Sequence, residues 1–187
     1  MSRIVVDSIR NSSASSDALT LSSDGKVAFP NNTGNILQVV STTKTDTFSS
    51  TTVNLMVDIT GMSATITPVS TSSKILIYYD LNMSGTELFF IQLVRGSTNI
   101  KIGDSDSSNR IECTAGGVVQ SGNNDKVQVI AGSFLDSPNT TSSTTYKIQG
   151  RVYNSGSSFS LNKPINDSNA IYTGRGASTL TLMEVAA

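Results

Sequence analysis

Apolar and polar residues alternate in the stretch 145–153, and the alternation separates two faces. One face carries Tyr146, Ile148, Gly150 and Val152, and the other carries Lys147, Gln149 and Arg151. A period of two predicts a strand with one face on a core and the other in water or against a neighbour. The run 127–135 precedes it across a loop of Pro, Asn and Ser residues. The two runs therefore predict a pair of long antiparallel strands.

The final run, 178–185, repeats the alternation. We predict that Leu180, Leu182 and Val185 point into the core, and that Thr179, Thr181 and Glu184 point outward. This run therefore supplies a further strand to the same core.

From residue 36 onward, short apolar runs follow one another with turn residues between them. The predicted strands are 36–41, 53–58, 61–68, 74–81, 88–95, 99–102, 159–161 and 170–172, with weaker ones through Cys113 and Val118–Val119 and a polar loop around Phe48. The run 74–81 is nearly continuous in apolar residues, which is typical of a strand covered on both sides. About ten short strands without helical segments predict an antiparallel β-sandwich, most simply a jelly roll. An immunoglobulin-like sandwich is the alternative, although the Cys and Trp positions of that family are missing.

The first 35 residues have a different character. Ile4–Val6 is a short apolar patch, and a Ser-rich joint follows it. Leu19–Leu21 and Val27–Phe29 then flank Asp24-Gly25, which is a strong hairpin signal. A hairpin of this size is not stable alone in water. We therefore predict an N-terminal attachment arm, residues 1–35, that borrows its core from the rest of the chain, from sister chains or from a docking partner, and a sandwich domain, residues 36–187.

Charge is sparse and balanced in this sequence. The 187 residues carry a formal net charge of −1, and 14% of them are charged. Nucleic-acid and membrane-surface binding need a basic face, so we expect no nucleic-acid partner. No apolar run approaches the roughly 20 residues that span a bilayer, so we expect no membrane insertion. The single cysteine, Cys113, excludes an intrachain disulfide and favours synthesis in a reducing compartment.

Catalysis has few candidate residues. The sequence contains no histidine, which excludes Ser-His-Asp and Cys-His arrangements. Asp104 with Asp106, or Glu112, are the nearest candidates for acid–base work on sugars, as in a polysaccharide-degrading spike. The run 104–109 also spaces oxygen ligands as a calcium loop does, but the Gly and terminal Glu of such a loop are missing. We favour a solvated turn, and we predict no enzyme, no cofactor and no catalytic or metal site.

Three further features have both a functional and a structural interpretation. Cys113 is predicted to be a buried, inert thiol. Arg175, between two glycines, can stack on or pair with a partner, but an ordinary loop is favoured. Tyr146, Tyr153 and Tyr172 can line a carbohydrate-binding surface, and packing between sheets explains them equally well.

Several motifs resemble a known group of proteins. The runs GSFLD (132–136), TTYKIQ (144–149) and YTGRGASTLTLMEV (172–185), with Asn162, resemble the C-terminal domain of small tail-fibre-like and head-fibre-like phage virion proteins, of the type seen in marine bacteriophages and cyanophages. The runs ILQVVS (36–41), ATITP (64–68) and SSKILI (72–77) resemble the first half of the same group, and IVVDSIRN (4–11) with FPN (29–31) resembles its N-terminal segments.

The resemblance implies a trimeric jelly-roll knob, similar to the tumour-necrosis-factor and C1q folds, carried on a virion by the N-terminal arm. It implies synthesis in the cytoplasm of a host bacterium and docking of residues 1–35 on a tail, portal or capsid protein. A host-surface glycan or protein is a candidate partner of the free end, where we expect the loops 137–143 and 154–158. The alternative is a capsid decoration or cement protein, a head fibre, without a receptor role, because no repetitive shaft separates arm and knob.

Overall fold

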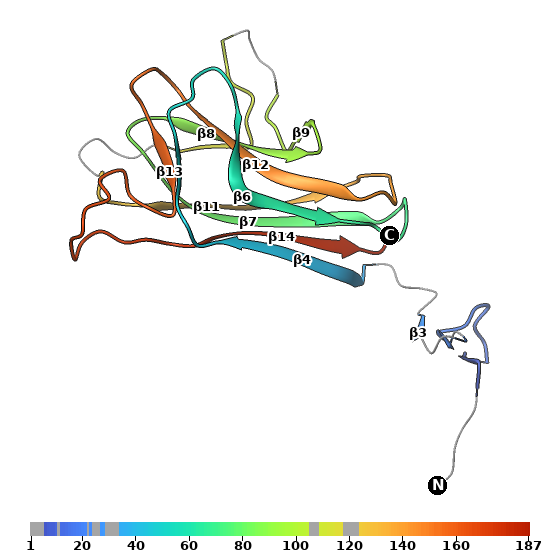
Figure 1. Ribbon diagram of the computed structural model, residues 1–187. Helices are drawn as coiled ribbons and strands as arrows, with labels where there is room; N and C mark the ends of the chain where they lie inside the picture. The colour runs from blue at the N-terminus through green and yellow to red at the C-terminus, as the bar shows by residue number, and fades with distance from the viewer. Residues whose placement is uncertain are drawn as a thin grey trace.

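The computed structural model is an all-β sandwich of two antiparallel sheets (Figure 1). It describes residues 6–10, 12–21, 23, 27–28, 34–104, 109–117 and 124–187, and no helix occurs among them. We name each sheet after a central strand. The β7 sheet consists of β4 (Ile36–Lys44), β5 (Phe48–Ser50), β7 (Lys74–Gly85), β11 (Gln128–Asp136), β13 (Phe159–Leu161) and β14 (Ser178–Val185). The β8 sheet consists of β6 (Val57–Ile66), β8 (Phe89–Arg95), β9 (Thr98–Ile100), β10 (Ala115–Gly117) and β12 (Thr144–Val152).

The strand order is that of a jelly roll. In the β7 sheet, β14 and β13 lie end to end along one side of β7, β4 and β5 lie beyond them, and β11 lies on the other side. In the β8 sheet, β10 and β9 lie end to end along β8, followed on its other side by β12 and β6. If β4 with β5, β13 with β14, and β9 with β10 are each counted as one position, every sheet has four positions. Numbered along the chain, these positions lie in the order 1-8-3-6 in the β7 sheet and 2-7-4-5 in the β8 sheet. Eight positions wound between two sheets in this way form a jelly roll, so the predicted fold class is confirmed.

The described N-terminal residues form a separate small sheet. Its strands are β1 (Ser8–Ile9), β2 (Leu19–Leu21) and β3 (Val27–Ala28), paired in the order β1-β2-β3. Pairing of β2 with β3 agrees with the predicted hairpin, whose Asp24-Gly25 turn lies outside the described residues, as do Ile4 and Val5. Figure 1 shows this sheet beyond the start of β4, outside the two layers. That it attaches the protein to a partner stays a prediction.

A glycine merges two predicted strands into one. The sequence predicts strands at 53–58 and 61–68, whereas the structure has the single strand β6. Gly61 lies inside it with a φ of 85°, a conformation that glycine adopts without strain. The register against β12 shifts at this point, and the buried positions change parity between Ile59 and Met62. Gly61 is therefore the glycine of a β-bulge rather than of a turn.

Two other expectations about strands are wrong. The predicted strand 170–172 is part of the connection between β13 and β14, and Ile171 is fully exposed. Phe48, expected in a loop, begins β5 and packs against the core. A short apolar triplet can belong to either kind of segment, because only its neighbours in space decide whether it is buried.

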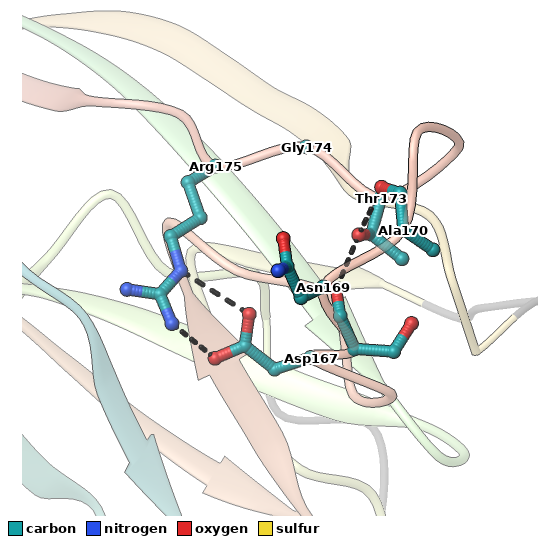
Figure 2. Close-up of a pocket in the computed structure, with 7 residues that line it drawn as sticks. Asp167, Asn169, Ala170, Thr173, Gly174 and Arg175 are labelled. Carbon is teal, nitrogen blue, oxygen red and sulfur yellow. Dashed lines mark hydrogen bonds and ion pairs between the residues drawn. The ribbon is translucent and has the colours of Figure 1, made fainter.

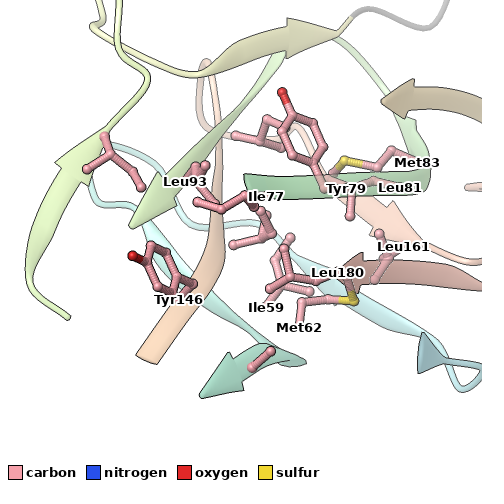
Figure 3. Close-up of a cluster of buried hydrophobic side chains, with 14 of the residues drawn as sticks. Ile59, Met62, Ile77, Tyr79, Leu81, Met83, Leu93, Tyr146, Leu161 and Leu180 are labelled. Atoms are coloured by element: carbon pink, nitrogen blue, oxygen red, sulfur yellow. The ribbon is translucent and has the colours of Figure 1, made fainter. Parts of the chain in front are cut away.

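The core lies between the two sheets and draws on both (Figure 3). Its fully buried side chains include Met62, Ile77, Leu81, Met83, Phe89, Leu93, Tyr146, Ile148, Phe159, Leu161, Leu180 and Leu182. Gly150 faces the same layer, where a Cβ atom would lie only 2.7 Å from the Phe159 ring. The alternation predicted for 145–153 is thus confirmed, with Gly150 making room for an aromatic ring.

In the last strand, β14, the structure reverses the predicted orientation of two side chains. Leu180 and Leu182 are buried as predicted, but Glu184 is buried beside them and Val185 lies on the outer side, opposite to expectation. Strict alternation places residue 184 inward, and the carboxylate there is satisfied by hydrogen bonds. It accepts one from the backbone N–H of Val69 at 2.8 Å and one from the side chain of Gln38.

This buried carboxylate predicts a pH dependence of stability. Burial alone would raise its pKa, but hydrogen bonds from Gln38, Ser73 and the backbone of Val69 and Ser70 outweigh that and lower the pKa of Glu184. A lowered pKa contributes stability that is complete above the ordinary value of 4.5 and is lost as the pH falls through the folded-state value. Glu184→Gln is expected to cost about 1–3 kcal/mol near pH 7. Thermal melts of both proteins from pH 7 to pH 3 should show the difference shrinking below pH 4.5; a constant difference would contradict this account.

Candidate functional site

A polar hollow of about 390 Å³ lies in the connection between β13 and β14 (Figure 2). It is lined by Asp167, Ser168, Asn169, Ala170, Thr173, Gly174 and Arg175. The guanidinium of Arg175 donates to both carboxylate oxygens of Asp167, from Nε at 3.2 Å and from Nη2 at 2.5 Å. The hydrogen bond from Arg175 lowers the pKa of Asp167. Both charged groups of the hollow are therefore already engaged with each other.

Hydrogen bonds within the connection hold its shape. The Thr173 hydroxyl donates to the carbonyl oxygen of Ser168 at 2.6 Å, and its backbone N–H donates to that of Ala170 at 3.1 Å. Residues 170–173 thus form a tight turn that presents Ile171 and Tyr172 to solvent.

Asn162 fixes the base of this connection to the sandwich. It is fully buried, with a φ of 63°, a left-handed conformation that asparagine tolerates. Its amide donates to the carbonyl oxygens of Lys44 at 2.7 Å and Asp46 at 2.9 Å, and its side-chain oxygen accepts from Ser178 at 2.6 Å. The connection is therefore anchored to the edge of the β7 sheet.

The lining of the hollow suits hydrogen bonding to a polar ligand better than catalysis. Its lining residues supply one carboxylate, from Asp167, so the hollow lacks the carboxylate pair that glycoside hydrolysis uses. Arg175 lies in a loop, as expected, and pairs within it.

Two of the three acidic candidates lie within the described residues. Asp104 and Glu112 are exposed, while Asp106 and residues 105–108 in general lie outside the described residues. Within the described part of the chain, no group of three or more Cys, Asp or Glu side chains is placed to hold a metal ion. The nature of the run 104–109, a solvated turn or a calcium loop, stays a prediction, because residues 105–108 lie outside the described residues.

The cysteine and the three candidate tyrosines differ in how deeply their side chains are buried. Cys113 is half-buried, and burial raises the pKa of its thiol, which disfavours the reactive thiolate. Tyr146 is fully buried and donates to Asp136 at 2.7 Å, so it belongs to the packing between the sheets. Tyr153 and Tyr172 are exposed and stay available for contact with a partner.

The two loops expected to share one tip lie at opposite ends of the sandwich. Residues 137–143 precede β12 and residues 154–158 follow it, so the nine residues of β12, about 30 Å, separate them. The first loop lies at the end where β4 begins, because Asp136 pairs with Ile75, and Ile36 and Lys74 both pair with Val185. That end adjoins the small N-terminal sheet (Figure 1). The free end carries residues 154–158 and the connection with the polar hollow, since Phe159 pairs with Gly85 at the far end of β7.

The outer faces of the two sheets differ in chemistry. On the β8 sheet, Asp58 accepts hydrogen bonds from Lys147 at 2.9 Å and Gln149 at 2.7 Å. The hydroxyls of Thr65 and Thr145 are 2.8 Å apart on the same face. None of the exposed large hydrophobic residues in the described chain lies on β6, β8 or β12. The outer side of β6 and β12 is therefore suited to water, whereas the outward residues Gln92 and Val94 of β8 are buried.

The outer face of the β7 sheet is apolar along one row. Val39, Met183, Leu76 and Leu135 stand opposite one another on β4, β14, β7 and β11, and we call them the apolar row. Val39 is 56% exposed and Leu135 47%, so the row is open at both edges of the sheet. Tyr78, in the next row, is also 47% exposed. The sequence predicted cover on both sides of β7, and in a single chain the outer side is open.

Comparisons with known proteins give matches of low similarity, among solved structures alone. No protein-family model and no curated protein matches the chain. Among solved structures, it is similar to the protein of T=1 particles derived from infectious bursal virus, with a TM-score of 0.42 and 16% identity over 86% of this chain and 39% of that one. The VP2 subviral particle of infectious bursal disease virus gives a TM-score of 0.38 at 16% identity over 87% and 40% of the two chains. This chain therefore spans about two fifths of the length of those proteins.

A membrane-spanning helix is not among the described elements.

Proposed function

We propose that the chain is a structural protein of a bacteriophage virion. It forms a short trimeric fibre or tail appendage, attached through the N-terminal arm and displaying the sandwich domain as a knob. The observation that carries this proposal is the separate N-terminal sheet, which has strands of only two or three residues and exposed apolar side chains.

The N-terminal sheet needs a partner. Val6, Ile9 and Leu21 are 42%, 56% and 40% exposed. Strands this short do not hold together in water without a further layer, and unpaired strands readily add to another sheet. Docking by strand addition on a tail, portal or capsid protein would bury these side chains and complete the sheet.

The motifs of the resemblance support an assembly role. Asp136, from the run GSFLD, accepts hydrogen bonds from Tyr146, of the run TTYKIQ, and from Arg95. Asn162 and Ser178, from two further motifs, bond to each other at the base of the β13–β14 connection. The shared residues therefore hold the sandwich together, which is what a structural module needs.

Contact with a host surface is the finer part of this proposal, and the free end is the place for it. Ile171 and Tyr172 project there from a turn braced by hydrogen bonds, as adhesive residues do on a rigid scaffold. A capsid decoration protein is the second candidate, favoured because the sequence has no repetitive segment between arm and sandwich.

Adsorption of phage to its host in the presence of excess purified protein distinguishes the two roles. We expect the protein to slow adsorption, and the double variant Ile171→Ser, Tyr172→Ser to compete at least about tenfold less well, as when two anchor residues are lost from a contact. Val69→Ser is the matched control, because Val69 is 69% exposed at the arm end and should compete like wild type. Absence of competition by the wild-type protein would favour the decoration role.

A further inference from the structure

The apolar row indicates a surface that a second protein layer covers. The inner residues of β7, such as Ile75, Ile77 and Leu81, are fully buried, while its outer residues Leu76 and Tyr78 remain partly open. Contiguous apolar surface on an otherwise polar protein marks an interaction site. The polar outer side of β6 and β12 shows that this sequence makes a solvent-compatible strand face where one is needed.

Two charged residues flank the apolar row, and their arrangement indicates that a second copy of the chain covers it. Lys74 and Asp80 stand on the outer side of β7, at either end of the segment that carries Leu76 and Tyr78. They are six residues apart, or about 20 Å along the strand. Neither side chain has an ion-pair partner among the described residues. A second copy, turned so that its β7 runs antiparallel to the first, places Lys74 of each copy at Asp80 of the other.

The surface has a place for the incoming lysine. A shallow hollow of about 480 Å³ is lined by Tyr78, Tyr79, Asp80, Ala131, Gly132, Ser133, Thr179 and Thr181. Its neighbours on β11 and β14 have small side chains, so the hollow is open beside the Asp80 carboxylate. In the antiparallel arrangement, residues 74–76 of one copy face residues 78–80 of the other.

We propose that two copies of the chain pack face to face through the outer face of the β7 sheet, related by a two-fold axis that crosses the strands. Such a contact is self-complementary, because each copy offers the same surface to the other. A parallel arrangement, as around a three-fold axis along the strands, would instead bring like charges together. The pairing is therefore a second contact beside the trimer of the proposed function, and it joins chains of two different trimers.

Oligomer mass and a charge exchange test this pairing on the full-length protein. Leu76→Glu is expected to halve the native mass, whether the paired species is a dimer or a pair of trimers. Lys74→Glu and Asp80→Lys are each expected to weaken the pairing by about 10- to 100-fold, because like charges then face each other across the interface. The double variant Lys74→Glu, Asp80→Lys should restore it, and so should a mixture of the two single variants.

Circular dichroism and thermal melting show whether each variant keeps its fold, and the exposed sites of the charge variants make loss of fold a small concern. An unchanged mass for Leu76→Glu would show that the face is free or is covered by the chain's own N-terminal arm, and would overturn the pairing. Failure of the double charge exchange to restore association would overturn the antiparallel geometry. Incorporation into virions is measured separately, so loss of this pairing leaves the proposed function untouched.

Discussion

Removal of residues 1–33 is expected to leave the sandwich domain folded and to abolish incorporation into virions. The cut stops at residue 33 because Gly34 donates to the carbonyl oxygen of Ala186 and Asn35 accepts from the N–H of Ala186, which extends the β4–β14 ladder. All residues of the hydrophobic core lie beyond the cut. The free energy of unfolding, followed by thermal melting, should therefore change by less than about 1 kcal/mol, as for changes away from a core.

Virion incorporation is measured by mass spectrometry of phage particles produced with the full-length or the truncated protein. The matched control is a carrier protein fused to residues 1–35, which should be incorporated if the N-terminal arm alone provides docking. A truncated chain that unfolds would show that the N-terminal sheet belongs to the sandwich itself. A truncated chain that still appears on virions would place the docking surface elsewhere on the domain.

Local alternation is the reason that so much of the fold could be predicted from the sequence. In β12 and β14 each inward side chain is followed by an outward one, so the order of residues predicts both the strand and its buried face. Glu184 was predicted to point outward because it is charged, whereas the two-residue period of the strand places it inward. A carboxylate can be buried when Gln38 and the backbone of Val69 satisfy it, and those partners are distant in the chain.

The candidate interaction surfaces were harder to predict, because they arise from register between distant strands. The apolar row joins Val39 to Leu135 through strands separated by most of the chain. Each of its members is an ordinary apolar residue within its own strand. Likewise, the prediction that loops 137–143 and 154–158 share one tip is wrong, because β12 separates them. Sequence spacing therefore predicts elements, and pairing decides which residues share a surface.

A buried ion pair gives the largest expected effect of a single substitution. Asp136 is 6% exposed and accepts from Arg95 at 2.7 and 2.8 Å and from Tyr146 at 2.7 Å. Burial, followed by the hydrogen bond to Asp136, raises the pKa of Tyr146, so its hydroxyl keeps the proton that it donates. Asp136→Ala leaves the buried Tyr146 hydroxyl without its acceptor and the Arg95 guanidinium with the carbonyl oxygen of Ser137, at 3.2 Å, in place of a carboxylate. We expect a loss of about 3–5 kcal/mol in the free energy of unfolding, measured by urea denaturation.

Two variants separate burial from pairing as the cause. Asp167 pairs with Arg175 by a similar two-oxygen contact, but the Arg175 side chain is 64% exposed, against 26% for Arg95. Asp167→Ala is therefore expected to cost much less than Asp136→Ala, because solvent screens an exposed pair. Tyr146→Phe removes only one neutral donor and should cost about 1–2 kcal/mol. If Asp136→Ala and Asp167→Ala cost the same, burial is not the reason that the Asp136 network stabilises the fold.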